Sequence, residues 1–150
     1  STTSDTRFEA NWEQATLPGL TSGARYFYKY NDMSTTGLIQ NTMIPMLRLG
    51  EMYLIAAESE PETLNDGLPY INTLRNKRGI SNLGSLTVTE LTYEYMRELY
   101  GEGQLFYFYK RTFTTILNRT NSSGSRPMGQ SASTQVFVVP LPDTEINNRQ

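Results

Sequence analysis

The densest run of hydrophobic positions spans residues 43–59, MIPMLRLGEMYLIAAES. Only Arg48, Glu51 and Glu58 interrupt the apolar or small side chains that would cover the circumference of a helix. A helix that is apolar all round is buried on several sides. The pattern therefore predicts a central helix over 43–59, in which Gly50 lets a neighbouring helix approach closely despite its propensity cost of up to about 1 kcal/mol.

A second helix is predicted over residues 66–78, where Asn65 or Asp66 can cap the first turn. Gly79 follows at the position where helices commonly end in a left-handed residue. Basic residues near this end are favoured by the helix dipole. The apolar stripe consists of Leu68, Ile71 and Leu74, and the basic residues are Arg75, Lys77 and Arg78.

A third helix is predicted over residues 88–100, because Thr87 and Glu90 have the spacing of a capping box. The sequence Gly-Glu-Gly at 101–103 ends or bends this helix, and a fourth helical segment is expected over 104–118. We expect the two glycines to turn the chain and the aromatic row after them to bury most of the fourth helix. The expected buried stripe of the third helix is Val88, Leu91, Tyr95 and Leu99.

The remaining segments indicate loops with a little β structure. Residues 25–30, RYFYKY, alternate as a strand does, with the three tyrosines on one face. Residues 119–134 are polar and rich in serine and glycine, which is typical of a loop. The β-branched run that opens VFVVPLP, residues 136–142, predicts a short extended segment. The pattern as a whole predicts a mainly α fold with long irregular loops and minor β structure.

Composition restricts the chemistry of this chain. Its 150 residues suit one domain, and its net charge of −2 gives no indication of nucleic-acid or anionic-lipid binding. It contains no histidine and no cysteine, which excludes a Ser-His-Asp triad, a cysteine nucleophile and a His or Cys zinc site. We therefore expect no cofactor and no metal. No run of about 18 apolar residues is present to span a membrane.

Four glutamates spaced four residues apart form an acidic row: Glu90, Glu94, Glu98 and Glu102. One interpretation is a solvated helix face, supported by a Glu94–Arg97 pair and by the helix dipole at Glu90. The other is a carboxylate pair for acid–base work, as in glycosidases, or a calcium site. We favour the solvated face, since no residue pattern marks these carboxylates as desolvated.

The aromatic residues near the N-terminus suggest a binding surface. Tyr26 and Tyr28 would share a strand face, and Trp12 lies upstream. Sugar rings have apolar faces that stack on aromatic rings, while tyrosine hydroxyls can bond the rim. An ordinary half-buried strand packed on helices is the alternative. We predict Trp12, Tyr26 and Tyr28 as candidate ligand-binding residues on the strength of their chemistry.

Four stretches, taken in order, resemble the C-terminal part of the RagB/SusD family of outer-membrane nutrient-uptake lipoproteins of Bacteroidetes. They are RLGEMYLIAAES, YINTLRNKRGI, the segment from Glu94 to Arg111, and VVPLPDTEI. The matching residues are Arg48, Glu51, Tyr53, Leu54, Ala57 and Glu58; Asn72, Arg75 and Gly79; Glu94, Glu98, Leu99, Glu102, Gly103 and Arg111; and Pro140, Pro142, Glu145 and Ile146. Gly50 replaces a family alanine, and Leu105 and Phe108 replace a polar pair, an exchange that can be neutral for stability.

This resemblance implies a fold and a role. The fold would be tetratricopeptide-like helical-repeat packing, with residues 1–150 as the C-terminal portion of a SusD-like domain in a longer protein. The role would be non-enzymatic: binding an oligosaccharide at the cell surface and working with a TonB-dependent, SusC-like β-barrel transporter. The outer-membrane lipid anchor would lie outside this chain, and no nucleic acid would be involved. None of the three aromatic candidates matches a family binding motif.

Two alternatives remain at this point. One is a helical protein–protein interaction scaffold, or a peptide-binding uptake component, without sugar binding; it predicts exposed helix faces rather than exposed rings. The other, more remote, is a carboxylate glycosidase, which predicts two carboxylates across a cleft and at least one raised pKa.

Overall fold

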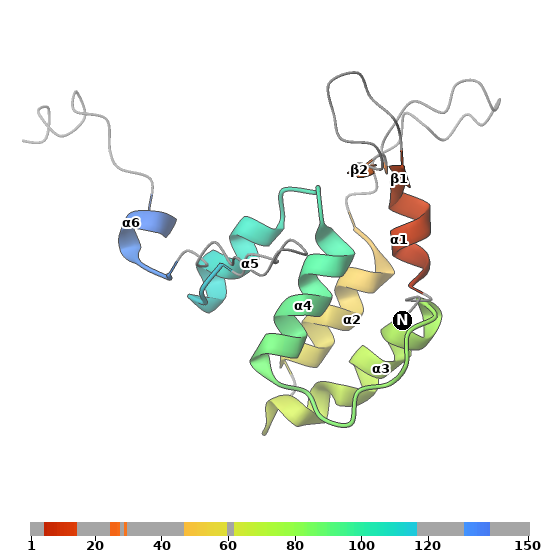
Figure 1. Ribbon diagram of the computed structural model, residues 1–150. Helices are drawn as coiled ribbons and strands as arrows, with labels where there is room; N and C mark the ends of the chain where they lie inside the picture. Colours follow the sequence, from red (N-terminus) through yellow and green to blue (C-terminus); the bar gives the residue numbers. More distant parts are fainter. Residues whose placement is uncertain are drawn as a thin grey trace, which may run out of the picture. The chain divides into compact units, whose positions relative to one another are not determined.

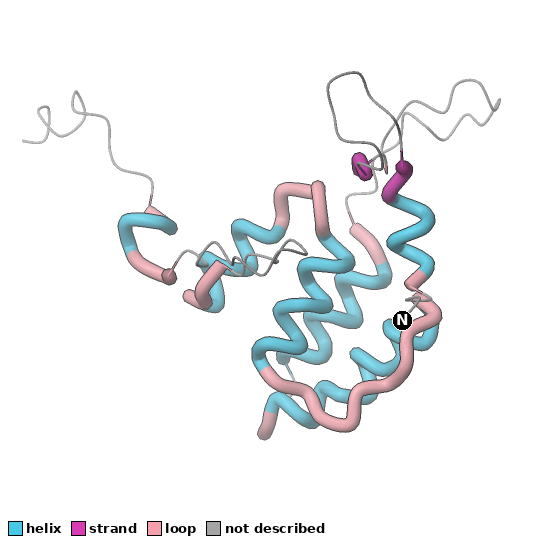
Figure 2. Tube along the Cα trace, viewed as in Figure 1, coloured by secondary structure: helices cyan, strands magenta, loops and turns pink. Residues whose placement is uncertain are grey.

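The computed structural model describes residues 5–14, 25–27, 29, 47–59, 62–116 and 131–138. Most of these residues are helical, which confirms the mainly α fold class (Figures 1 and 2). The tetratricopeptide-like packing stays a prediction. The elements are α1 (Thr6–Asn11), β1 (Trp12–Gln14), β2 (Arg25–Phe27), α2 (Leu49–Ser59), the 3-10 helix η3 (Leu64–Gly67), α3 (Leu68–Lys77), α4 (Val88–Leu99), α5 (Leu105–Thr112) and α6 (Thr134–Phe137).

The chain divides into two compact units, Ser1–Gly101 and Glu102–Gln150. The assignment of residues 1–150 to the C-terminal portion of one SusD-like domain stays a prediction. Among the helices of the described residues, none combines the length and hydropathy that a membrane span requires.

The core of the first unit lies where α2 packs against α3 and α4 (Figure 1). The predicted stripe of α3 is confirmed, with Ile71 and Leu74 buried and Leu68 half-buried. The predicted stripe of α4 is confirmed except at Val88, which is 57% exposed because it occupies the first turn. The buried apolar residues of this unit are Leu54, Ala57, Ile71, Leu74, Leu86, Leu91, Tyr95 and Leu99.

Helix α2 begins later and is less enclosed than its sequence indicates. It starts at Leu49 rather than at residue 43. The Arg48 carbonyl, directly before the helix, accepts the Met52 N–H at 3.2 Å in the first helical hydrogen bond. Residues 43–46 lie outside the described residues. The expectation of burial on all sides is also wrong, since Leu49, Met52 and Ile55 are exposed. Helices α3 and α4 cover only part of the circumference of α2.

Two glycines permit close contacts around α2. A Cβ at Gly50 would overlap the Glu98 carboxylate of α4, which confirms the predicted close approach at this position. A Cβ at Gly67, at the end of η3, would overlap the backbone carbonyl of Ala57 in α2. Both positions are buried, so neither contact can relax into solvent.

The start of α3 differs from the prediction that Asn65 or Asp66 caps it. Thr63 is the capping residue of the preceding 3-10 turn, and its backbone N–H donates to Asp66 Oδ2 at 2.8 Å. Asn65 instead accepts the Leu86 N–H at 3.0 Å and so fixes the loop that leads to α4. The predicted end is confirmed: Gly79 has a φ of 74°.

The loop between α3 and α4 is held by side chains of α3. Asn72 donates to the Leu83 carbonyl at 3.1 Å and accepts the Leu83 N–H at 2.8 Å. Helix α4 then begins as predicted, with Thr87 Oγ1 accepting the Glu90 N–H at 3.2 Å.

The predicted turn at the two glycines is confirmed, since Gly101 and Gly103 each have a φ of 76°. Helix α5 follows, but it ends at Thr112 because Phe113 adopts a left-handed φ of 50°. The helix therefore does not extend to residue 118, of which residues 117–118 lie outside the described residues. Its aromatic row is only half enclosed: Phe108 and Tyr109 are buried, whereas Phe106 and Tyr107 are exposed.

The last described segment forms a helical turn, α6, rather than an extended strand. Val136 and Phe137 belong to this turn, whose Val138 N–H donates to the Thr134 carbonyl at 2.8 Å. Phe137 is buried within the second unit, where its ring lies 6.0 Å from Phe106 and 5.8 Å from Phe113. Residues 139–142 of the predicted extended segment, and the 119–130 part of the predicted loop, lie outside the described residues.

The small sheet is an antiparallel pair, β1 with β2. The strand predicted over 25–30 is confirmed for Arg25–Phe27 but is wrong at Lys29, which lies in a turn. Tyr28 and Tyr30 lie outside the described residues. Trp12 is paired with Phe27, Glu13 with Tyr26, and Gln14 with Arg25.

Candidate functional site

The strand register places the candidate residues Trp12 and Tyr26 on different faces. Directly paired residues in an antiparallel sheet share one face, and successive residues alternate. Trp12 therefore lies with Phe27, whereas Tyr26 lies with Glu13 and donates its hydroxyl hydrogen to Glu13 Oε2 at 2.6 Å. A single flat platform of Trp12 and Tyr26 is excluded. As ligand-binding residues, Trp12, Tyr26 and Tyr28 stay predictions, and Tyr28 lies outside the described residues.

Trp12 instead belongs to a cluster of three rings with Phe27 and Tyr100, which we call the aromatic triad. The ring centroids are 5.3 Å apart for Trp12–Phe27, 5.0 Å for Trp12–Tyr100 and 5.1 Å for Phe27–Tyr100. The interplanar angles of 64°, 46° and 70° are those of edge and tilted contacts, which aromatic quadrupoles favour. Trp12 and Phe27 are half-buried, and Tyr100 is 46% exposed.

The triad depends on the turn that follows α4. Tyr100 comes directly after the last residue of α4, and Gly101 then turns the chain with its positive φ. A Cβ at Gly101 would overlap the Phe27 ring, so only glycine allows the hairpin to approach the turn this closely. Sequence patterning missed Tyr100 because both rings that it contacts, Trp12 and Phe27, lie far from it in the sequence, and a helix-end tyrosine carries no signal of its own.

Two exposed polar side chains continue the same sheet face. Gln14 and Arg25 are paired across the strands, and each lies two residues from a triad ring along its own strand. Positions two apart in a strand share a face. The Arg25 guanidinium lies 4.5 Å from the centroid of the Phe8 ring, a cation–π contact that restrains it.

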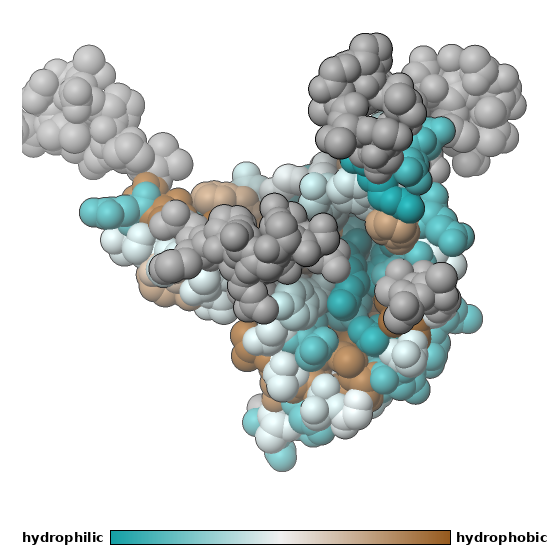
Figure 3. All heavy atoms as spheres, viewed as in Figure 1, coloured by the Kyte–Doolittle hydropathy of each residue, from teal (hydrophilic) through white to brown (hydrophobic). Residues whose placement is uncertain are grey.

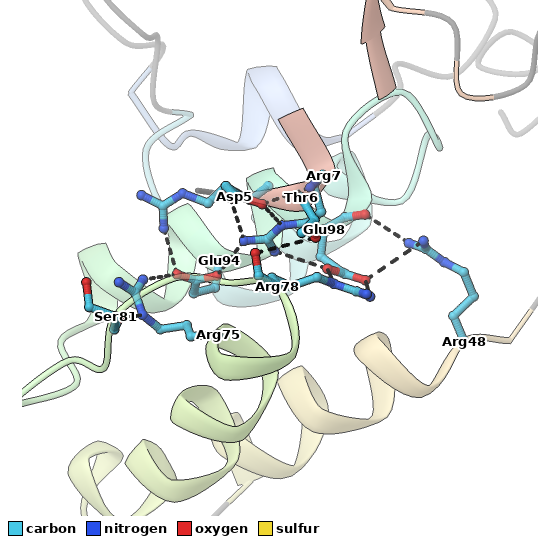
Figure 4. Close-up of polar contacts among 10 residues, drawn as sticks. Asp5, Thr6, Arg7, Arg48, Arg75, Arg78, Ser81, Glu94 and Glu98 are labelled. Carbon is cyan, nitrogen blue, oxygen red and sulfur yellow. Dashed lines mark hydrogen bonds and ion pairs between the residues drawn. The ribbon is translucent and has the colours of Figure 1, made fainter. Parts of the chain in front are cut away.

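The acidic row of α4 proves to be partly a buried ion cluster, shown in Figure 4. Glu94 is 0% exposed and Glu98 is 3% exposed, so the solvated-face interpretation is wrong for these two residues. They are adjacent to the apolar stripe of α4 and are covered by arginines from other segments. Glu90 is half-buried, and Glu102 lies beyond the end of α4 in the second unit.

Glu94 is bound by three guanidinium groups. Its Oε1 accepts a hydrogen bond from Arg75, which is itself buried, and another from Arg97 at 2.6 Å. Its Oε2 lies 3.5 Å from Arg7 of α1. The Glu94–Arg97 pair expected from the sequence is therefore confirmed, but within a cluster that joins α1, α3 and α4.

Glu98 is bound by a second set of arginines. Arg78 donates to both of its carboxylate oxygens, at 2.6 and 3.2 Å, in the bidentate geometry that makes arginine pairs strong. Arg7 donates to Oε2 at 3.0 Å. Arg48 lies 3.9 Å from Oε1 and donates to the Glu98 backbone carbonyl at 2.9 Å, which ties the start of α2 to the end of α4.

The N-terminal helix is attached through the same cluster. Asp5 caps α1 by accepting the Arg7 N–H at 3.0 Å, and it accepts two guanidinium hydrogens from Arg7, both at 2.9 Å. The Thr6 N–H donates to the Arg78 carbonyl at 3.0 Å. Arg7 is buried and bonds to Glu94 and Glu98, so its side chain anchors this helix. In the view of Figure 3, the described surface around α1 carries both hydrophilic and hydrophobic patches.

The cluster favours the ionised forms of Glu98 and Asp5 by lowering the pKa of each. Burial acts to raise the pKa of Glu98, but hydrogen bonds and charge from Arg78 and Arg7 outweigh it and lower the pKa from its usual value. Burial acts on Asp5 in the same direction, and Arg7 again outweighs it, so this pKa is lowered too. Burial acts to lower the pKa of Arg7, but Asp5, Glu94 and Glu98 raise it overall.

This arrangement suits structure rather than chemistry. A glycosidase acid needs a raised pKa, whereas the pKa of Glu98 is lowered and guanidinium groups occupy the oxygens of both buried glutamates. Those oxygens are not open to a calcium ion either. Within the described residues, no group of three or more Asp or Glu side chains could hold a metal ion.

Four of the residues that carry the family resemblance belong to this cluster. They are Arg48, Arg75, Glu94 and Glu98. Nearby, Glu58 of α2 accepts the Tyr95 hydroxyl hydrogen at 2.8 Å. The physical role of these residues is to join segments of the fold.

Comparison with known proteins gives consistent matches. The model of the SusD family matches residues 3–149 of this chain. The curated protein "Starch-binding protein SusD" from Bacteroides thetaiotaomicron is 32% identical over 113 residues, which is 73% of this chain and 20% of the relative. The aligned part of this chain thus spans about one fifth of the length of that relative. No solved structure gives a significant match.

Proposed function

Because the chain belongs to the SusD family, we propose that it is part of a non-enzymatic, cell-surface protein that binds oligosaccharides for nutrient uptake. The observation that carries this proposal is the 32% identity to a protein named for starch binding. Within the described residues, half-exposed aromatic rings on the β hairpin offer suitable binding chemistry, because sugar faces stack on such rings.

The proposed partner is a TonB-dependent, SusC-like β-barrel transporter of the outer membrane. Membership of the family supports this partner and a surface-exposed location with a lipid anchor outside the chain. The proposed mechanism makes and breaks no covalent bond. Ligand would be held by aromatic stacking and hydrogen bonds and passed on to the transporter, so no cofactor is required.

One observation favours a second candidate function, a helical interaction scaffold or a peptide-binding uptake component. Leu49, Met52 and Ile55 expose apolar side chains along α2, as an interaction scaffold would. A carboxylate glycosidase has no comparable support, because the buried glutamates are neutralised by arginines.

A membrane pull-down combined with glycan binding tests the proposal. The native protein is purified in mild detergent from membranes of its source, and the co-purifying proteins are identified by mass spectrometry. The same preparation is then titrated with oligosaccharides of several linkages, including maltoheptaose. Co-purification of a large β-barrel together with saturable glycan binding is expected. A β-barrel without glycan binding would favour the peptide-uptake alternative. If no β-barrel co-purifies and no glycan binds, the proposal is wrong.

A further inference from the structure

We propose that the aromatic triad, with Gln14 and Arg25 beside it, is a stacking site for one pyranose ring, with Tyr100 as the residue that carries most of the contact. This inference rests on the proposed oligosaccharide-binding function and assigns it to specific residues. It differs from the platform expected from the sequence, because Tyr26 lies on the opposite face of the hairpin.

Tyr100 contributes little to the core and is well placed for a ligand. It follows Leu99, the last buried residue of α4, and 46% of its surface stays exposed. An aromatic residue that is half exposed beyond the end of a helix stabilises the fold less than a buried one, because less apolar area is removed from water. Its exposed ring is therefore free to cover the apolar face of a sugar.

The other two rings hold Tyr100 in place. Trp12 and Phe27 lie 5.0 and 5.1 Å from it and are themselves half-buried. Gly101 makes this contact possible, since any Cβ there would overlap the Phe27 ring. A ring that is already fixed loses little conformational freedom when a ligand binds, which improves affinity without new contacts.

Polar groups beside the rings complete the composition of a sugar site. Gln14 offers an amide that can donate and accept, and Arg25 offers a guanidinium donor that the Phe8 ring restrains. A pyranose presents an apolar face and a rim of hydroxyl groups. Stacking on the ring of Tyr100 and hydrogen bonds from exposed Gln14 and Arg25 would satisfy both parts.

The test measures maltoheptaose binding to the full-length protein by isothermal titration calorimetry, with a panel of other oligosaccharides in parallel. For any glycan that binds the wild type, Tyr100→Ala is expected to weaken the Kd about tenfold, the loss of one stacked ring. Tyr100→Phe keeps the ring and is expected to restore most of the affinity. Tyr107→Ala, the same change at an exposed tyrosine of α5 outside the triad, is the matched control and is expected to leave the Kd unchanged.

A glycine pair provides a second test that leaves every ring in the sequence. Gly101→Ala and Gly103→Ala both place a side chain at a φ of 76°, but only the Cβ at residue 101 meets Phe27. We expect Gly101→Ala to weaken glycan binding and Gly103→Ala to leave it near wild type. Circular dichroism confirms that each variant is folded.

The outcomes separate the site from the function. If the wild type binds a glycan and Tyr100→Ala binds it equally well, the triad is not the site, although the proposed function stands. If Tyr107→Ala weakens binding as much as Tyr100→Ala does, the loss is not specific to the triad and the inference is wrong. If the wild type binds no glycan of the panel, both the function and the site assignment fail.

Discussion

Replacing Glu94 by glutamine should reveal how strongly the buried ion cluster holds the first unit together. The substitution keeps the size of the side chain and removes its charge. Arg75 and Arg7, both buried, then lose a carboxylate partner, and the new amide NH₂ group faces guanidinium donors. Removing one partner of a buried ion pair is strongly destabilising because an uncompensated charge stays buried.

The expected cost is about 3 kcal/mol, the lower end of the range for breaking a buried pair. The lower end applies because the side chain of the third partner, Arg97, is about a third exposed, so solvent screens its interaction with Glu94. A typical domain is stable by only about 5–15 kcal/mol, so this loss is large. Since tenfold corresponds to about 1.4 kcal/mol, amide protection in α4 should fall about 100-fold.

Hydrogen exchange read by mass spectrometry on peptides that cover α4 measures this loss in the full-length protein. Glu90→Gln is the matched control, because Glu90 lies one turn earlier on the same helix and is outside the cluster. The control should cost about 1 kcal/mol or less, the value of a charge near a helix N-terminus. Equal, small effects of the two substitutions would refute the buried-cluster reasoning and restore the solvated face.

Three further predictions concern packing, pH and the α3–α4 loop. Gly50→Ala should lower the free energy of unfolding by about 1 kcal/mol, because overpacking against Glu98 costs about 1–3 kcal/mol and the better helix propensity of alanine returns up to about 1 kcal/mol. Urea unfolding measures this change, and Gly84→Ala, whose Cβ would enter open space, is the control. An increase in stability would contradict it. The pKa of Glu98 is lowered on folding, so its contribution is complete above the usual value of 4.5 and is lost as the pH falls through the lower folded value. In Glu98→Gln, the free energy of unfolding should therefore fall less steeply as the pH is lowered than it does in the wild type. An unchanged slope would show that Glu98 does not contribute to acid sensitivity. Asn72→Ala should accelerate amide exchange at Leu83, whose two backbone groups bind Asn72; unchanged exchange would show that the loop is held otherwise.

Local sequence signals predicted the helices well wherever the deciding residues are close along the chain. The capping residue Thr87 and the terminal Gly79 act within one turn, so their positions mark the ends of α4 and α3 correctly. The start of α2 was misplaced because an apolar pattern does not mark where a helix begins; Arg48, whose carbonyl accepts the Met52 N–H, comes directly before the helix. The end of α5 was misplaced because Phe113 takes a left-handed conformation that no local residue type signals.

The burial of Glu94 and Glu98 was not predictable from periodicity. A hydrophobic pattern counts every glutamate as surface, whereas these two are buried because arginines from distant segments neutralise them. One signal was present: Arg75 and Arg78 are three residues apart, so they share a face of the chain near the end of α3. The triad partner Tyr100 could not be found at all without the fold, because its contacts come from the strand pairing and from the turn after α4.

The attachment of α1 through Arg7 also has a consequence for the order of folding. Arg7 and Glu98 are 91 residues apart in the sequence, whereas α2, α3 and α4 follow one another closely and can assemble first. Closing a longer loop costs more chain entropy, so the contacts of α1 are expected to form after the transition state. Arg7→Ala should then speed unfolding and leave the folding rate unchanged in stopped-flow experiments, and slower folding would reverse this order. On this view the N-terminal helix determines how long the unit stays folded rather than how fast it folds.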